Sequence, residues 1–254
     1  MKIGISGKGG VGKTTISAGL ARIFSREGEK VIALDTDSSP NLITTLGGAK
    51  ADIKPLTEMN DLIAEKTGVK PGSGYGQMFK LNFTVDDILD RFGIECNDGV
   101  QLLVAGSIRQ GGGGCFCPEN ALIKKLLQHY INKSDYTLIM DMEAGIEHLG
   151  RGTTENIDVL ITVVEPNLRS VETAERINKL SKDIGIKNNV AVLNKVKNLR
   201  EKKIIEDKLS ELSIPIIYTI PYSDSVNEAD LKGTSVFDED EKLMNIMSEL
   251  KQKL

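Results

Sequence analysis

The stretch MKIGISGKGGVGKTT, residues 1–15, decides the fold of this 254-residue chain. Its centre, GKGGVGKT at residues 7–14, fits the phosphate-binding loop pattern G-x-x-x-x-G-K-[ST]. An apolar strand is predicted before the loop at residues 2–6, and an amphipathic helix after it at residues 14–26. This strand–loop–helix context is the one the motif requires, so we predict a phosphate site here and not a ligand-free glycine turn.

The residue types of the loop suit phosphate chemistry. Its glycines let the backbone turn with the N–H groups pointing inward, which forms an anion-binding nest at a helix N-terminus. The Lys13 ammonium can reach the β- and γ-phosphates, and the Thr14 hydroxyl can bind Mg²⁺. The nucleotide-binding residues predicted in the loop are Gly9, Gly10, Val11, Gly12, Lys13, Thr14 and Thr15.

The rest of the chain alternates between strand-like and helix-like segments. Strands are predicted at residues 31–34, 101–105, 136–140, 159–164, 190–193 and 214–220, and helices at residues 118–130, 170–184, 199–211 and 240–253. Because the strands are almost continuous runs of Val, Ile and Leu, we predict an α/β fold whose mainly parallel sheet has helices on both faces. Residues 47–98 are more polar and are predicted to be an insertion with short helices within one P-loop domain of residues 1–254.

The bulk composition narrows the function class. A formal net charge of −4 disfavours a nucleic-acid partner. The sequence has no signal-like or membrane-spanning apolar run, so we expect a cytoplasmic protein without a membrane partner. Three cysteines, Cys96, Cys115 and Cys117, are too few and too unevenly spaced for a disulfide framework.

Lys8 is a second lysine within the loop, which the general P-loop pattern does not require. The run from Lys8 to Thr14 resembles the deviant Walker A ATPases, which include the nitrogenase iron protein, the septum-site and plasmid-partition ATPases and the arsenite pump ATPase. The resemblance implies an ATP-dependent homodimer with nucleotide at its interface, in which the early lysine contacts the phosphates bound to the partner. Lys8 and Lys13 are therefore predicted catalytic residues, and a solvated loop lysine is the alternative for Lys8.

Further short motifs match this family in order and spacing. Asp35-Thr36-Asp37 resembles its first switch, which implies that Asp37 orients the attacking water. Asp141 ends an apolar strand and resembles the Walker B aspartate, which holds Mg²⁺ through water. Asn194 resembles the residue that reads the adenine edge, and Pro221 belongs to a segment resembling the loop that covers the base. Each match alone is weak, because an aspartate at a strand end is often a turn or cap residue.

Cys115-Phe116-Cys117 is the most distinctive motif outside the loop. Thiols at i and i+2 of an extended segment can bind one soft metal ion, but a closed thiolate site usually needs four ligands. A two-fold dimer would supply them by doubling the pair. Pro118 suits the first position of a helix, which places Cys117 near the N-cap, where the helix dipole favours the metal-binding thiolate. Small apolar fillers or a redox pair are the alternatives, and Cys96 is interpreted as structural.

The combination of the loop, the Cys-x-Cys motif and MDMEAGIEHL at residues 140–149 resembles the nickel-insertion accessory ATPases of carbon monoxide dehydrogenase. The sequence VEPNL at residues 164–168 supports the same resemblance. It implies a nickel-enzyme client, carbon monoxide dehydrogenase or the related acetyl-CoA synthase. The nitrogenase iron protein has a cluster-binding cysteine in its second switch, whereas residues 141–150 contain none, which disfavours an iron–sulfur cluster of that kind.

Several other residues have ordinary alternatives. His129 and His148 could bind metal, although capping or packing roles are commoner for histidine. Glu143, Glu147 and Glu165 could act at the nucleotide or dimer surface or be solvated. The apolar stripe of the last helix could bind a membrane, but its polar face lacks a basic rim, so docking on the core is favoured.

We therefore predict a homodimeric ATPase, using ATP/ADP and Mg²⁺, that carries Ni²⁺ on Cys115 and Cys117, with Zn²⁺ able to bind the same thiols in vitro. Three alternatives remain open. They are a partition- or septum-type scaffold on DNA or membrane, an electron donor, and a small-molecule kinase, for which Lys8 would have no evident role.

Overall fold

The computed structural model describes residues 1–37, 40–49, 53–71, 78, 80–107, 117–143, 146 and 156–254. Its strands are β1 (Lys2–Gly7), β2 (Val31–Asp35), β3 (Ile94–Glu95), β4 (Gln101–Val104), β5 (Thr137–Asp141), β6 (Val159–Val164), β7 (Asn189–Val196) and β8 (Ile216–Pro221). Its α-helices are α1 (Lys13–Arg26), α2 (Leu42–Thr45), α3 (Asn60–Thr67), α4 (Ile88–Phe92), α5 (Pro118–Asn132), α7 (Leu168–Asp183), α8 (Leu199–Glu211), α9 (Asp224–Lys232) and α10 (Glu241–Lys251). Short 3₁₀ turns are η1 (Leu56–Glu58), η2 (Asn97–Gly99) and η3 (Val236–Asp238).

The described strands form one sheet in the order β3-β4-β2-β5-β1-β6-β7-β8. Every neighbouring pair is parallel except β3 and β4. The predicted α/β fold with a mainly parallel sheet is confirmed. Because parallel strands end on the same side, the carboxyl ends of β1, β2, β5, β6 and β7 share one edge of the sheet, and ligands of such folds bind at that edge.

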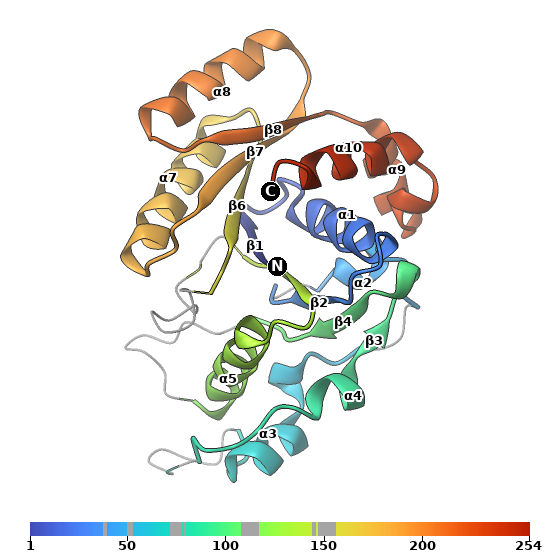
Figure 1. Ribbon diagram of the computed structural model, residues 1–254, viewed down its shortest axis with the longest axis vertical. Coiled ribbons are helices and arrows are strands. Elements are labelled where there is room, and N and C mark those ends of the chain that lie inside the picture. The colour runs from blue at the N-terminus through green and yellow to red at the C-terminus, as the bar shows by residue number, and fades with distance from the viewer. Residues whose placement is uncertain are drawn as a thin grey trace.

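Helices cover both faces of the sheet, as predicted (Figure 1). One face packs against α1, α2 and α10, and the other against α3, α5 and α7, with α8 completing the end near β7. Alternate residues of a strand supply the two cores: Ala33 of β2 lies in the first, and Ile32 and Leu34 lie in the second. Strands buried on both faces explain the nearly unbroken apolar runs in the sequence.

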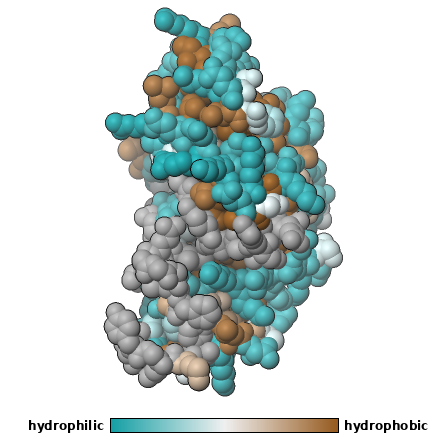
Figure 2. Space-filling view, turned by 90° about the vertical axis from the view of Figure 1, so that its left-hand side faces the viewer, coloured by the Kyte–Doolittle hydropathy of each residue, from teal (hydrophilic) through white to brown (hydrophobic). Residues whose placement is uncertain are grey.

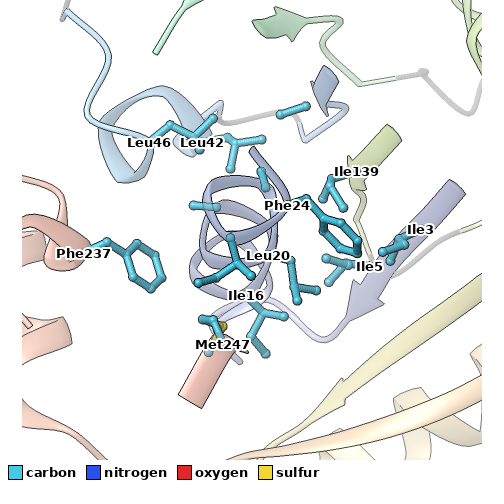
Figure 3. Close-up of a cluster of buried hydrophobic side chains, with 14 of the residues drawn as sticks. Ile3, Ile5, Ile16, Leu20, Phe24, Leu42, Leu46, Ile139, Phe237 and Met247 are labelled. Carbon is cyan, nitrogen blue, oxygen red and sulfur yellow. The ribbon is translucent and has the colours of Figure 1, made fainter. Parts of the chain in front are cut away.

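Helix α1 lies at the centre of the first core, where side chains from the sheet, α2, α10 and η3 point toward it (Figure 3). Leu20 and Met247 are fully buried there. The apolar stripe of α10 is buried, with each residue at most 4% exposed: Leu243, Met244, Met247 and Leu250. The helix therefore docks on the core, as the sequence predicted. α1 ends at Arg26, and Gly28 shortly after it has a φ of 90°, the left-handed conformation that commonly follows a helix.

A buried arginine joins distant parts of the chain around α1. Arg22 is 3% exposed, and its guanidinium donates to Asp98 at 2.5 Å and to Asp238 at 2.7 Å. It also donates to the Ser235 hydroxyl at 3.1 Å. These contacts tie η2 and η3 to the helix that follows the loop.

Within residues 47–98 the described residues form η1, α3, α4, β3 and the start of η2. Lys66 of α3 contacts Asp87 at 2.6 Å, and Arg91 of α4 contacts Glu65 at 2.8 Å, so α3 and α4 are joined by ion pairs. β3 was not expected from the sequence, because two residues in a polar stretch carry no alternating pattern. It adds an antiparallel edge strand to β4.

Element boundaries differ from the predictions where side chains cap the helices. α7 begins at Leu168, two residues before the predicted start, because the Asn167 side chain accepts the Ser170 N–H at 2.9 Å and caps it. The helix α9 was not predicted, although Ser223 before it and Gly233 after it are ordinary start and stop residues.

The surface on the side of α7 and α8 is mainly hydrophilic near the top, with scattered hydrophobic patches (Figure 2). In the part of the chain that the structure describes, no helix combines the length and the apolar character needed to cross a bilayer.

Candidate functional site

The loop between β1 and α1 has the backbone shape that phosphate binding requires. Gly10 and Gly12 have φ angles of 78° and 98°, which residues with side chains rarely adopt. A Cβ atom at Gly12 would lie 2.3 Å from Asn194 Nδ2, and one at Gly7 would lie 2.5 Å from the Val163 carbonyl oxygen. Glycine is therefore needed at both ends of the loop. Lys13, the first residue of α1, is 7% exposed.

Two carboxylates lie side by side at the ends of β2 and β5. Asp35 and Asp141 are register partners, and both are almost completely buried. Burial, and then the charge of Asp141, raise the pKa of Asp35 to about 7. Burial raises the pKa of Asp141 to about 6, although Thr14 and Lys13 act in the opposite direction. Burial and mutual repulsion both disfavour simultaneous ionisation of two neighbouring carboxyl groups.

The donors present fit Mg²⁺. The Thr14 hydroxyl donates to Asp141 Oδ2 at 2.7 Å, which places the two predicted ligand side chains together. The other oxygen, Asp141 Oδ1, is buried and has no hydrogen-bond partner among the described residues. Oxygen donors of this kind are the ones that Mg²⁺ prefers. Bound there, Mg²⁺ would neutralise phosphate charge beside Lys13.

The segment after β2 is fixed to β5. Both the N–H and the hydroxyl of Thr36 donate to the Asp141 carbonyl, at 3.0 and 2.9 Å. The Asp37 N–H donates to Asp35 Oδ1 at 3.1 Å. Asp37, the residue predicted to orient water, lines the same cavity as the loop.

That cavity has a volume of about 720 Å³, within the range of small-molecule sites. Besides the loop and Asp37, it is lined by Asn41, Thr44 and Thr45 around α2 and by residues of α9 and the turn after it, among them Asn227. Sequence reasoning missed these walls. The wall formed by α9 could have been suspected from the helix-capping residues that flank this segment. No local sequence pattern indicates that Thr44 and Thr45 line the cavity.

A second, narrower pocket adjoins the loop. Its lining includes Thr15, Asn194, Pro221, Tyr222 and Asn227. The Asn194 amide donates to the Val11 carbonyl at 2.7 Å, so in this structure Asn194 braces the loop. The predicted roles of Asn194 at the base edge and of Pro221 above the base stay predictions, and the pocket brings both residues together.

Lys8 lies at the mouth of the loop and contacts an acid of its own chain. Its ammonium is 3.6 Å from Glu165 Oε1, and its side chain is 36% exposed. Lys195, which follows Asn194, donates to the Gly10 carbonyl at 2.5 Å and lies 3.9 Å from Glu165 Oε2. The sequence motif Asn194-Lys195 predicted a role for Asn194 and none for Lys195. In the structure the φ of Lys195 is 60°, which is unusual for a lysine.

Part of the predicted metal motif is described. Cys117 is the N-cap residue of α5, partly buried, with Pro118 at the first helical position as expected. Cys115 lies outside the described residues, as do His148 and Glu147. No cluster of three or more His, Cys, Asp or Glu side chains suited to a metal occurs in the described ranges.

The remaining candidates have structural surroundings. Cys96 is buried, and burial raises the pKa of its thiol to about 11, which keeps it unreactive. His129 lies 3.6 Å from Asp86 and packs edge-on against Tyr130. The Glu143 carbonyl accepts a hydrogen bond from the Ser6 hydroxyl at 2.8 Å.

Comparisons with known proteins agree with this geometry. Residues 3–236 match the family model described as the CobQ/CobB/MinD/ParA nucleotide binding domain. An uncharacterized ATP-binding protein of Methanocaldococcus jannaschii is 42% identical, with 99% of each chain covered. The carbon monoxide dehydrogenase accessory protein CooC of Rhodospirillum rubrum is 39% identical, covering 94% of this chain and 90% of that protein. The MinC:MinD cell division complex of Aquifex aeolicus contains a similar fold, with a TM-score of 0.70 at 19% identity over 100% of this chain and 95% of that one.

Proposed function

We propose that this chain, which belongs to the CobQ/CobB/MinD/ParA nucleotide-binding family and is an ATPase, uses ATP to control a nickel site shared by two copies of itself. The metal ion is cargo in this proposal, and a nickel enzyme is the client. The observation that carries it is the position of Cys117. The thiol stands at the N-cap of α5, a helix that begins beyond the carboxyl end of β4, on the sheet edge that holds the nucleotide loop.

The ATPase half of the proposal assigns roles to residues around the cavity. Lys13 stabilises the charge on the β- and γ-phosphates, and Thr14 with Asp141 holds the magnesium ion. Asp37 orients the attacking water. Lys8 contacts the phosphates bound to the second copy, so that ATP draws two chains together and hydrolysis loosens them.

The metal half rests on ligand chemistry. Cys115 and Cys117 provide two thiolates for each chain, and two copies would provide the four that a closed soft-metal site needs. Ni²⁺ and Zn²⁺ both accept thiolates, and affinity alone does not favour nickel over copper or zinc. Nickel selection would come from site geometry or metal supply.

The client is proposed from similarity. The 39% identical protein of Rhodospirillum rubrum is named as an accessory protein of carbon monoxide dehydrogenase. Carbon monoxide dehydrogenase, or an acetyl-CoA synthase with a related nickel centre, is therefore the proposed recipient, and the cytoplasm is the proposed compartment.

A partition- or septum-type scaffold remains the second candidate function, because the solved structures with a similar fold include a cell division protein. The buried apolar side of α10 gives no support to membrane binding by this helix. DNA binding would show as a strongly salt-dependent affinity for duplex DNA.

The test is nickel-binding stoichiometry by calorimetry, combined with sizing of the same samples. The proposal expects one tight ion for two chains in the wild type and none after Cys115→Ser with Cys117→Ser. Cys96→Ser is the matched control, because that thiol is buried outside the motif and should leave binding unchanged. Cysteine-independent binding, or none, with normal ATP hydrolysis would remove the nickel proposal and leave the scaffold.

A further inference from the structure

Glu165 stands between two lysines at the mouth of the nucleotide loop. It follows β6 directly, and its two carboxylate oxygens lie 3.6 Å from Lys8 Nζ and 3.9 Å from Lys195 Nζ. β6 is the sheet neighbour of β1, with Gly7 paired to Val163, so adjacent strand ends bring Lys8 and Glu165 together. The contact is therefore built into the sheet.

The Glu165 carboxylate is held in place without Lys8. The Asn167 amide donates to Glu165 Oε1 at 2.7 Å, and the Glu165 N–H donates to the Ser170 hydroxyl at 3.1 Å. Asn167 is itself fixed, since its side-chain oxygen caps α7 by accepting the Ser170 N–H. A carboxylate held by the N-cap residue of the following helix, α7, offers Lys8 a preformed partner.

The two lysines differ in how firmly they are held. Lys195 is fixed to the loop by its hydrogen bond to the Gly10 carbonyl. Lys8 and Lys195 are equally exposed, at 36% and 37%, but among the described residues the contact recorded for the Lys8 side chain is the ion pair with Glu165. Lys8 is therefore the lysine that can leave, and leaving costs it the contact with Glu165.

We infer that Glu165 is a positioning residue that retains Lys8 on its own chain and so sets the protein concentration at which two copies assemble on ATP. This inference rests on the proposed function, in which Lys8 contacts the phosphates of the second copy. Each Lys8 has to exchange Glu165 for those phosphates, so the ion pair opposes assembly. An exposed pair of this kind is worth about a 1.4- to 5-fold factor, and a dimer breaks two, which gives about 2- to 25-fold in the dissociation constant.

The experiment measures ATP turnover for each chain against protein concentration at saturating Mg-ATP. Glu165→Gln should reach half of its plateau at a protein concentration about 2- to 25-fold lower than the wild type, with the plateau itself unchanged. Glu172→Gln is the control, since it removes an equal charge from an exposed position on the nearby helix α7, and it should behave as the wild type. A change in the plateau without a change in the half-point would contradict a positioning role.

A second variant, Asn167→Ser, tests the inference independently in case Glu165→Gln does not fold. Asn167→Ser retains a capping side chain for α7 but removes the amide that fixes Glu165, so it should lower the half-point in the same direction and by less. An unchanged half-point in both variants would overturn the inference.

Two further variants, Lys8→Ala and the double substitution Lys8→Ala with Glu165→Gln, distinguish failure of this inference from failure of the proposed function. A double-mutant cycle compares the effect of Glu165→Gln in the wild-type background with its effect in the Lys8→Ala background. Its readout is the dimer dissociation constant in saturating Mg-ATP, measured by sedimentation, because Lys8→Ala removes a predicted catalytic residue. If Glu165 acts through Lys8, the substitution has no effect in the Lys8→Ala background. An equal effect in both backgrounds would mean that the carboxylate acts by general repulsion of phosphate, which overturns the inference. If Lys8→Ala alone leaves turnover and its concentration dependence unchanged, the proposed dimer mechanism fails instead.

Discussion

The paired carboxylates at the ends of β2 and β5 should make the stability of the nucleotide-free protein fall as pH rises. Asp35 is fully buried, and burial together with the charge of Asp141 raises its pKa from 3.8 to about 7. The folded protein therefore holds a proton that the unfolded chain releases between about pH 4 and pH 7. A group with a raised pKa in the folded state stabilises fully below its unfolded pKa and loses that contribution as pH rises through the folded value.

The magnitude follows from the interval between the two pKa values. About three pH units at about 1.4 kcal/mol each gives an upper bound of about 4 kcal/mol for the contribution of Asp35. Asp35→Asn removes this pH dependence. It also loses a hydrogen bond, because Asp35 accepts the N–H groups of Asp37 and Leu42 with separate oxygens, and an amide has one acceptor oxygen. That loss costs about 1–3 kcal/mol at every pH and does not change the slope.

Urea unfolding at several values between pH 5 and pH 8, in EDTA and without nucleotide, measures the effect. Relative to Asp35→Asn, the wild type should lose about 1.4 kcal/mol of unfolding free energy for each pH unit up to about pH 7, and then no more. Asp230→Asn, an exposed carboxylate on the wall of the same cavity, should keep the wild-type profile. Parallel profiles for the wild type and Asp35→Asn would refute a raised pKa of Asp35 in the folded protein.

Three more substitutions have defined outcomes. Gly12→Ala should weaken ADP binding at least about tenfold in a fluorescence titration with little loss of helix content, because the left-handed backbone penalises a Cβ and Asn194 occupies its space; unchanged affinity would contradict this. Asn194→Ala should weaken ADP binding about 3- to 10-fold through loss of the brace on Val11, and a larger effect for ATP than for GTP would show that it also reads the base. Arg22→Met should lower the unfolding free energy by about 1–3 kcal/mol in urea, because it removes the hydrogen bonds that the buried guanidinium donates to the partly exposed Asp98 and the exposed Asp238; a loss below about 1 kcal/mol would contradict this.

The features that sequence predicted well are continuous along the chain. The loop occupies eight consecutive residues between an apolar strand and a helix, so all of its signals are local. The limits of α8, Leu199–Glu211, coincide with the prediction, because its capping residue Asn198 and its apolar positions are also local. β3 was missed because two residues cannot display a period, and its edge position comes from pairing with β4.

The features that sequence could not predict depend on the order of strands in the sheet. Asp35 was seen only as the first residue of a switch motif, because nothing in the chain says that β2 lies beside β5. Its raised pKa is a consequence of that neighbour and of burial. Its burial could have been suspected only from its position at the end of an apolar strand.

Glu165 illustrates the same limit more sharply. From the sequence it could equally be a solvated residue, since it lies 157 positions after Lys8 along the chain (165 − 8). The sheet order places β6 beside β1, and the pairing of Gly7 with Val163 leaves Lys8 and Glu165 as residues that emerge from neighbouring strand ends. In a parallel sheet every such pair is brought to the same edge as the ligand. A charged residue just beyond a strand is therefore best judged by which strand lies next to its own, and Glu165 becomes a candidate for control of Lys8 on that ground alone.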